Sequence, residues 1–451
     1  MTSLHWFRQD LRLTDNAALL AAVEQGPSAC LYVLDDDTPG EWCIGGAQRW
    51  WLHHSLTSLS TSLAAIGGTL ILRRGPAAVT VAAVAEEIGA TSIHATRLAE
   101  PWWRAIDAEL GDRLTLHDGD TLVPSEQVRT GSGTPFKVFG PFYRALTMHL
   151  PPPKPLAAPQ RISSPPDGTT SDRLEDWQLL PTKPDWATGF DDWHPGEEGA
   201  AARIADFADK VSDYAVRRDL PSKEGTSRLS PHLHFGEVSA RQLWHALAAH
   251  RDQPKASAAK FLKELAWRDF SRSALLAEPR LASHATRAEP KWRYGENADA
   301  DFTAWTRGRT GYPIVDAGMR QLWATGWMHN RVRMIAASFL CKHLLIDWRR
   351  GAAWYRDTLV DADLGNNSLN WQWIAGTGSD SAPFARIMAP LVQSAKFDAA
   401  AYVRRWVPEL AELADANIHD PVKRGPYPAP LIGHREARER ALAALASGHT
   451  S

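Results

Sequence analysis

The stretch LHWFRQDLRLTDNAALLAAVEQGPSACLYVL, residues 4–34, decides the fold of the first part of the chain. Short apolar runs at 4–7 and 29–34 have the length and composition of buried strands. The alanine- and leucine-rich segment 16–25 between them predicts a helix. A strand, a helix and a second strand at this spacing predict a parallel pair of strands.

The same alternation continues to about residue 130. Further strands are predicted at 69–72, 92–95 and 114–117, and helices at 47–65 and 77–88. Residues 1–130 therefore predict a doubly wound parallel sheet, which is a Rossmann-like α/β domain. A Gly-x-Gly-x-x-Gly motif does not follow the first strand, and this argues against a nicotinamide dinucleotide site.

The composition changes after this domain. Residues 131–200 are predicted to be an interdomain linker, because ten of the fifty residues in 151–200 are proline. Residues 201–451 show helical spacing and predict an all-helical domain. Its predicted helices are 201–214, 240–250, 256–276, 314–325, 330–345 and 352–359. The predicted fold class is therefore α/β plus all-α.

The charge is distributed unevenly along the chain. Residues 1–150 carry 11 Lys or Arg and 16 Asp or Glu, whereas residues 201–360 carry 26 and 17. A basic segment of this kind favours a polyanionic partner such as nucleic acid, although proteins that bind no anion carry similar charge.

Cysteine content and hydropathy indicate in which compartment the protein works and whether it carries a disulfide framework, a metal site or a membrane segment. Cys30, Cys43 and Cys341 are too few and too scattered for a disulfide framework or a zinc site, so no metal site is predicted. The first ten residues lack the pattern of a leader peptide, and apolar runs stay well short of the roughly 18 residues of a membrane span. We expect a monomeric, cytoplasmic protein without a membrane segment.

The segment 261–270 is predicted to be helical, and it places four chemically different side chains on one face: Glu264, Trp267, Arg268 and Ser271. A carboxylate, an indole and a guanidinium together can bind a base edge, stack on a base and hold a phosphate. An intrahelical pair of Glu264 with Arg268 beside a half-buried tryptophan explains the same pattern.

Two later segments carry polar groups with the same ambiguity. Asn330, Arg333 and Met334 share a helical face, and an acidic turn with Asp361 and Asp363 follows. These acids can pair with Arg333, hold a polar cofactor, or simply cap a helix. Similarly, the hydroxyl-rich loop at 225–231 is either a phosphate cradle or a helix cap.

Five motifs in this order resemble the photolyase/cryptochrome family, and the resemblance runs from residue 4 to about residue 406. They are WFRQDLRLTDN (6–16), RRDLPSKEGTSRLSPHLHFGE (217–237), ELAWRDF (264–270), GYPIVDAGMRQLWATGWMHNRVRM (311–334) and DADLGNNSLNWQW (361–373). The chain most resembles a bacterial class I photolyase for cyclobutane pyrimidine dimers. This implies an antenna-type α/β domain, a helical domain that binds FAD and DNA, and a light-driven carbon–carbon lyase acting on UV-damaged DNA.

The resemblance also implies roles for individual residues. Implied FAD-binding residues are Tyr214, Thr226, Ser227, Arg228, Leu229, Ser230, Arg333, Asp361, Asp363 and Asn367. Implied catalytic or lesion-pocket residues are Glu264, Trp267, Asn330, Met334, Asn367 and Trp373. Implied DNA contacts are Arg218, Glu264, Trp267, Arg268, Ser271, Asn330, Arg331 and Gln393. Implied carriers of electrons to the flavin are Trp371, Trp348 and Trp292.

Two departures from the family pattern carry expectations of their own. Trp102 and Trp103 stand where some members bind folate, whereas Glu100 lies in a context closer to deazaflavin-binding members. The alternatives for a second antenna chromophore are therefore folate in another pose, deazaflavin, or none. Alanines at 385 and 389 replace an aromatic residue and an asparagine, and local repacking is expected there.

The resemblance leaves alternative functions. A cryptochrome-type photoreceptor has the same fold, but Asn367 and the absence of a long extension after the helical domain favour repair. A 6-4 photolyase is disfavoured by Met334, because that branch uses histidines in the lesion pocket. A flavin-free DNA-binding or scaffold protein would require the loop and the acidic turn to be incidental.

Overall fold

The computed structural model describes residues 2–163, 169–248, 257–381 and 383–448. The chain divides into two compact units. Unit 1 comprises residues 1–186, 191–212 and 227–279, and unit 2 comprises residues 187–190, 213–226 and 280–451. This division differs from the predicted three segments, because helices on both sides of residue 200 belong to the unit that contains the sheet.

Unit 1 is built on a five-stranded parallel sheet of order β3-β2-β1-β4-β5. All five predicted strands are confirmed. Leu4 pairs with Ala29 on one side and with Ile93 on the other, and these side chains are buried in the core of the sheet. The strands are β1 (Thr2–Phe7), β2 (Ser28–Leu34), β3 (Leu70–Arg74), β4 (Ala90–Thr96) and β5 (Leu114–His117).

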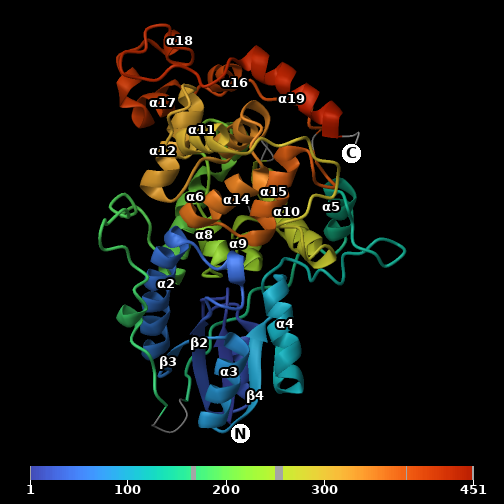
Figure 1. The fold of residues 1–451 in the computed structure, drawn as a ribbon. Helices are drawn as coiled ribbons and strands as arrows, with labels where there is room; N and C mark the ends of the chain where they lie inside the picture. Colours follow the sequence, from blue (N-terminus) through green and yellow to red (C-terminus); the bar gives the residue numbers. More distant parts are fainter. Residues whose placement is uncertain (1, 164–168, 249–256, 382, 449–451) are drawn as a thin grey trace. The chain divides into compact units, whose positions relative to one another are not determined.

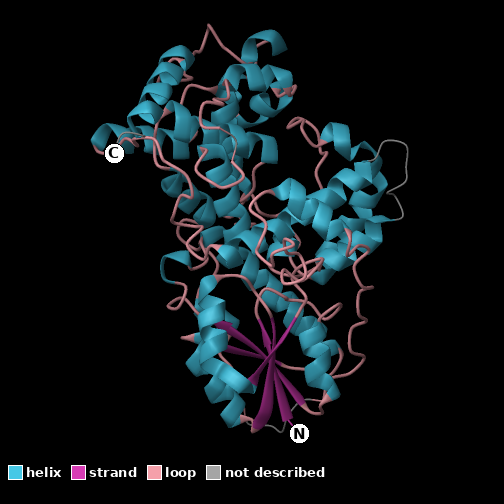
Figure 2. Cartoon of the chain, turned by 90° about the vertical axis from the view of Figure 1, so that its right-hand side faces the viewer, coloured by secondary structure: helices cyan, strands magenta, loops and turns pink. Residues whose placement is uncertain are grey.

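Helices lie on both faces of this sheet (Figures 1 and 2). The first begins where Asn16 accepts a hydrogen bond from the backbone of Leu19 at 3.0 Å, which is the usual helix-capping geometry. Apolar residues of the helical segments 77–87 and 101–110 pack with those of the strands in one buried cluster. The helices are α1 (Ala17–Glu24), α2 (Gly46–Ala65), α3 (Ala77–Glu87) and α4 (Pro101–Leu110).

Unit 1 also contains helices beyond the sheet. The helix α5 (Phe139–Thr147) lies inside the predicted linker and was not predicted. The helix α6 (Glu197–Lys210) begins four residues before the predicted start, where the acidic first turn Glu197–Glu198 favours a helix N-terminus. The remaining helices are α8 (Ser230–His234), α9 (Ala240–Ala248) and α10 (Ser257–Ala277). The predicted ends at 250 and 256 lie outside the described residues.

Unit 2 is helical, as predicted for this part of the chain. Three large buried side chains, Trp305, Trp348 and Trp371, belong to its core. The predicted helix 330–345 divides into an α-helix and a π-helical turn. The helices are α7 (Tyr214–Arg217), α11 (Glu296–Thr306), α12 (Pro313–Thr325), α13 (Asn330–Ser338), the π-helix Phe339–His343, α14 (Trp348–Thr358), α15 (Leu364–Ala375), α16 (Pro390–Lys396), α17 (Ala400–Trp406), α18 (Asp415–Ile418) and α19 (His434–Gly448).

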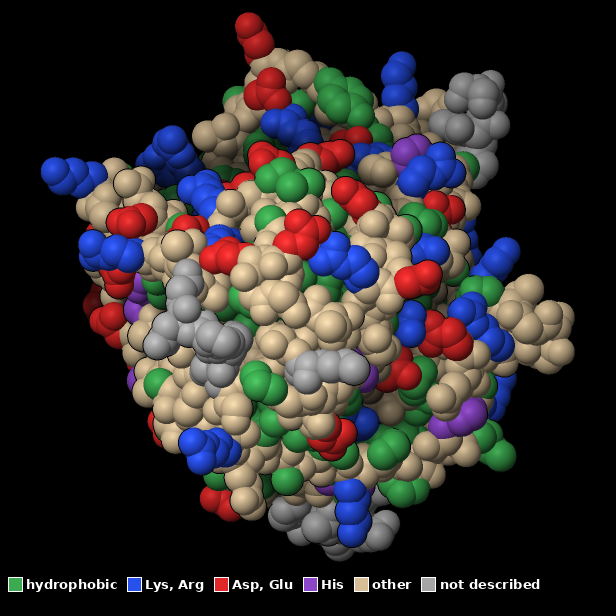
Figure 3. All heavy atoms as spheres, turned by 90° about the horizontal axis from the view of Figure 1, so that it is seen from below, with side chains coloured by type: hydrophobic (Ala, Val, Ile, Leu, Met, Phe, Trp, Pro, Cys, Tyr) green, Lys and Arg blue, Asp and Glu red, His purple; other side chains and the backbone are tan. Residues whose placement is uncertain are grey.

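The surface carries both signs of charge. On the face drawn in Figure 3, Lys and Arg side chains are interspersed with Asp and Glu side chains, which is typical of a solvated protein surface. Among the residues that the structure describes, every helix is too short or too polar to cross a lipid bilayer.

Candidate functional site

An ion pair in unit 2 joins the predicted arginine-rich helix to the acidic turn. Arg333 of α13 donates from Nη1 and Nη2 to the two carboxylate oxygens of Asp361, at 3.0 and 2.9 Å. Its Nε donates to the carbonyl oxygen of Met328 at 2.7 Å, so the guanidinium is held on two sides. The Asp361 side chain is 3% exposed, and a two-point bond of this kind fixes orientation as well as charge. The predicted pairing is confirmed.

The rest of the acidic turn forms the start of α15. Asp363 accepts a hydrogen bond from the backbone of Asn366 at 2.7 Å and therefore caps this helix. Asn367 donates from its side-chain amide to the carbonyl oxygen of Ala352 in α14, at 3.0 Å. The capping alternative thus holds for Asp363, and the pairing alternative holds for Asp361.

The hydroxyl-rich loop ends where α8 begins at Ser230. Arg228 has φ of +53°, a left-handed conformation that turns the backbone sharply within the loop. The Ser227 hydroxyl accepts a hydrogen bond from the backbone of Leu229 at 3.3 Å. Thr226 and the buried Tyr214 belong to unit 2, whereas residues 227–230 belong to unit 1.

Three predicted lesion-pocket residues lie in unit 2. Asn330 is the exposed first residue of α13, and Met334 lies one turn later on the same helix and is half-buried. Trp373, on α15, is partly buried and packs against the core of this unit. Met334 and Trp373 therefore lie at the boundary between core and solvent, and Asn330 lies at the surface.

The other two lesion-pocket residues, Glu264 and Trp267, lie on α10 in unit 1 and are half-buried. The Trp267 indole stacks on the Phe139 ring of α5, with ring centroids 3.5 Å apart and planes 7° apart. Phe139 thus covers one face of Trp267 and fixes its orientation. The unpredicted helix α5 has a structural role in this part of the site.

The predicted DNA contacts of Arg268 and Ser271 need correction. Arg268 is buried and forms an ion pair with Asp120, and it also donates to the carbonyl oxygen of Leu233. Ser271 is 0% exposed, and its hydroxyl donates to the carbonyl oxygen of Arg268 at 2.7 Å. Both side chains form hydrogen bonds inside unit 1, because this side of α10 is packed against the rest of the unit and not exposed to solvent.

The predicted DNA contacts Arg218 and Arg331 come together around a residue that sequence reasoning missed. The carboxylate of Asp219 lies 2.8 Å from Arg331 Nη2 and 3.9 Å from Arg218 Nε. The Arg331 guanidinium also stacks on the Phe397 ring at 4.6 Å. Asp219 directly follows the arginine pair 217–218, and this Arg-Arg-Asp sequence was the available signal. Gln393 is half-buried on α16.

The three predicted electron carriers differ in exposure. Trp371 and Trp348 are buried, and Trp292 is half-buried. Gly351 allows α14 and α15 to approach closely, because a Cβ at this position would lie 2.2 Å from the Trp371 ring. Tyr355, whose ring centroid lies 4.9 Å from that of Trp371, is an aromatic neighbour that the sequence did not reveal.

The two departures from the family pattern have local explanations. Trp103 packs edge-on against Trp6 at 5.7 Å, and the Arg8 guanidinium lies over both rings. The indole of Trp103 is thus part of the internal packing of unit 1. Ala385 is exposed, and Ala389 lies directly before α16, so neither alanine leaves a hole in the core.

The histidine before α13 should make stability depend on pH. His329 is buried, and its Nδ1 accepts a hydrogen bond from the backbone of Arg331 at 3.2 Å, which requires the neutral ring. Burial lowers the pKa of His329 to about 4. In the unfolded chain the ring titrates near pH 6.5, so between pH 6.5 and 4 the unfolded state binds a proton that the folded state excludes.

The stability that neutral His329 contributes to the folded state is therefore complete above pH 6.5 and is lost as the pH falls toward 4. His329→Asn keeps a capping side chain and removes the titration. We expect its free energy of unfolding to fall less than that of the wild type between pH 7 and 5, by up to about 2 kcal/mol. The exposed His284→Asn is the matched control, and equal slopes for the wild type and His329→Asn would contradict this explanation.

Comparisons with known proteins extend over both units. Residues 3–160 match the family described as DNA photolyase, and residues 261–447 match the FAD binding domain of DNA photolyase. The chain is 46% identical to the deoxyribodipyrimidine photo-lyase of Agrobacterium fabrum, over 98% of this chain and 97% of that protein.

Two solved structures have the same fold. One is a bacterial class III photolyase from Agrobacterium tumefaciens, with a TM-score of 0.94, 44% identity, and coverage of 100% of this chain and 98% of that chain. The other is a cryptochrome from Synechocystis sp., with a TM-score of 0.88, 27% identity, and coverage of 98% and 99%. The likeness therefore includes the sheet unit and the helical unit alike.

Proposed function

The chain belongs to the DNA photolyase and cryptochrome family, and on this premise we propose that it uses blue light to split cyclobutane pyrimidine dimers in UV-damaged DNA. The observation that carries the proposal is the near-full-length similarity to a deoxyribodipyrimidine photo-lyase, together with the lesion-pocket residue types of that branch. The reaction is a carbon–carbon bond cleavage without net oxidation.

The side chains present fit FAD, for which this chain carries the family's binding domain. Arg333 and Asp361 form an oriented charge pair that would lie beside the flavin ring, and the hydroxyls of Thr226, Ser227 and Ser230 are suitable donors to its phosphates. When bound, reduced FAD excited by light supplies the electron that opens the dimer. Arg333 would offset negative charge there, and Asp361 would hold Arg333 in place.

The lesion pocket requires the pyrimidine dimer to leave the duplex. Base-flipping enzymes, photolyases among them, extrude the target nucleotide, and a damaged pair lowers that cost. In our proposal Trp267 and Trp373 are apolar walls for the dimer, while Glu264 and Asn330 hydrogen-bond its carbonyl and imide groups. The stack of Trp267 on Phe139 would keep one wall rigid before the dimer enters.

The DNA strand would be held by basic and polar side chains outside the pocket. Arg218 and Arg331 are suitable contacts to phosphates, and Gln393 is a third candidate. Asp219 lies between the two arginines and would keep them in a fixed arrangement. Phosphate contacts position a duplex without reading its sequence, which suits an enzyme that recognises a lesion.

The motifs and the similar structures point to different branches of the family. The motifs resemble class I enzymes, whereas the similar Agrobacterium tumefaciens structure is described as class III, and the proposed reaction holds for either class. The similarity to a cryptochrome keeps a photoreceptor as the second candidate. Met334 in the lesion pocket argues against a 6-4 photolyase. We propose that the protein acts as a monomer. The alternatives for its antenna chromophore are folate, deazaflavin or none.

Survival after UV irradiation tests this function in cells. A bacterial strain that lacks its own photolyase and excision repair would express the chain, and colonies would be counted after blue light or darkness. We expect survival to rise by at least about 10-fold in blue light alone, since repair replaces a lethal lesion by intact pyrimidines. Equal survival in light and darkness, with FAD-loaded protein present, would favour the photoreceptor.

A further inference from the structure

One carboxylate oxygen in unit 2 touches two of the three predicted electron carriers. Glu289 Oε1 accepts hydrogen bonds from the indole Nε1 of Trp292 at 3.1 Å and from the indole Nε1 of Trp348 at 3.2 Å. The two indole nitrogens are therefore no further apart than the sum of these distances. Nothing in the sequence motifs singled out Glu289, and the Trp chain alone gives it no role.

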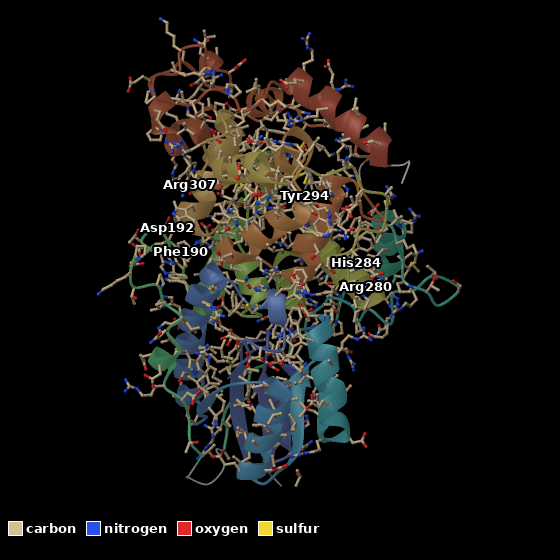
Figure 4. All side chains as sticks on the ribbon, viewed as in Figure 1. Phe190, Asp192, Arg280, His284, Tyr294 and Arg307 are labelled. Carbon is tan, nitrogen blue, oxygen red and sulfur yellow. The ribbon has the colours of Figure 1, made fainter. Side chains whose placement is uncertain are left out.

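The carboxylate of Glu289 is held firmly in this position. Arg349 donates from Nη1 to Oε1 at 3.0 Å and from Nη2 to Oε2 at 2.9 Å. Arg349 is itself bonded to Asp347 and to the carbonyl oxygen of Ser283. Asp347 also accepts from the hydroxyl of Tyr294, which is labelled in Figure 4, at 3.1 Å. Arg349, which holds Glu289, is therefore itself fixed by Asp347 and by the backbone of Ser283.

Glu289 keeps its negative charge and retains access to water. Burial raises the pKa of this carboxyl, but the hydrogen bonds from Arg349, Trp292 and Trp348 outweigh it, so the pKa is lowered overall. The side chain is 29% exposed, whereas the Trp348 side chain is fully buried. The Glu289 carboxylate therefore contacts the N–H of the buried Trp348 indole and can itself exchange protons with solvent.

The chemistry of an oxidised indole requires such a group. Removing one electron from tryptophan gives a radical cation, whose N–H is a far stronger acid than that of neutral indole. A carboxylate at 3.1 Å is within proton-transfer distance of that N–H. Loss of the proton leaves a neutral radical, and the electron can then return only if the proton also returns. A base at this place therefore prolongs the separation of charge.

We propose that Glu289 positions Trp292 and Trp348 and accepts the N–H proton of Trp292 after this indole is oxidised. The proposal rests on the proposed function, since bound, light-excited FAD in its oxidised form is the electron acceptor. One electron leaves Trp292 through Trp348 and Trp371, and the N–H bond breaks with its proton going to Glu289 Oε1. A thiolate then gives one electron to the neutral radical and Glu289 returns the proton, which leaves a thiyl radical.

Transient absorption of the FAD-loaded, oxidised protein tests this role. The tryptophan radical cation and the neutral radical have separate visible bands, so their interconversion can be timed after a laser flash. In Glu289→Gln the amide oxygen keeps a hydrogen-bond acceptor but removes the base. We expect neutral-radical formation in Glu289→Gln to slow by at least about 10-fold. This is less than the rate acceleration of about 100-fold or more that a positioned general base typically gives. Glu289→Asp should recover part of the rate.

Asp347→Asn is the matched control, because Asp347 contacts the same Arg349 and accepts its other bond from the phenol of Tyr294 rather than from the indoles of Trp292 and Trp348. Its neutral-radical formation should stay within about twofold of the wild type. Wild-type kinetics in Glu289→Gln, or flash-excited wild-type protein without any tryptophan radical, would overturn the proposal.

A second readout separates this proposal from the proposed function. Protein whose FAD has been reduced chemically needs no electron from the tryptophans, so Glu289→Gln reduced in this way should repair a thymine dimer as well as the wild type. Failure of both proteins to repair would contradict the proposed function, while the radical kinetics would still decide the role of Glu289. The indole N–H resonances of Trp292 and Trp348 in an ¹⁵N-labelled sample check the geometry, since both should shift in Glu289→Gln.

Discussion

Replacing Asp120 with asparagine is expected to lower the free energy of unfolding by about 3–5 kcal/mol. The Asp120 side chain is 7% exposed and bonds two buried arginines of α10, Arg268 and Arg272. Burial alone would raise the pKa of Asp120, but the two guanidinium groups hold it well below its usual range. The variant would leave both cations buried without their shared anion. Equilibrium unfolding in urea measures the difference.

Asp118→Asn is the matched control from the same segment. Its carboxylate is 54% exposed and lies 3.5 Å from Arg97 Nε at the surface. An exposed pair of this kind contributes about 0–1 kcal/mol, because solvent screens it. Equal losses of unfolding free energy in the two variants would contradict the assignment of Asp120 as the buried anchor of α10.

Trp267→Ala should weaken binding to DNA that contains a thymine dimer by about 10- to 100-fold, because stacking on an aromatic side chain contributes about 1–3 kcal/mol per base. Binding to undamaged DNA should change little, since phosphate contacts govern it. The measurement is a titration of fluorescently labelled duplexes, with and without the lesion, at fixed salt concentration.

The FAD content of this variant supplies the control. Trp267 is assigned to the lesion side of the pocket, so FAD bound per chain, read from its visible absorbance, should be unchanged. Trp267→Phe keeps an aromatic face toward Phe139 and should retain most of the affinity. A parallel loss of FAD in Trp267→Ala would place this indole on the cofactor side instead.

The sheet was predictable because its signal is local. Each strand is a short apolar run between turn residues, and a parallel sheet buried on both faces needs such runs. The helix α5 escaped prediction because the surrounding proline-rich composition suggested a linker, although Phe139 and Phe142 are buried side chains that require a folded environment. The start of α6 carried another signal, the acidic first turn Glu197–Glu198, which the apolar periodicity obscured.

Within the site, a contact between two consecutive motifs was predictable, whereas contacts between distant segments were not. The pairing of Arg333 with Asp361 followed from two adjacent motifs of unit 2. The pairing of Arg268 with Asp120 joins residues 148 positions apart, and helical spacing cannot show which side of α10 is packed. For the same reason Ser271 was assigned to DNA, whereas its full burial reflects packing within unit 1. Glu289 gave no sequence signal, because its role depends on three partners brought together by the fold.

The measurement that tests the central claim most directly is light-dependent repair by the purified protein. The protein with chemically reduced FAD would be mixed with an oligonucleotide that carries one thymine dimer, and the recovery of thymine absorbance near 260 nm would be followed. Recovery in blue light and none in darkness is the predicted result. No recovery in blue light, with reduced FAD bound, would contradict the assignment as a cyclobutane dimer photolyase.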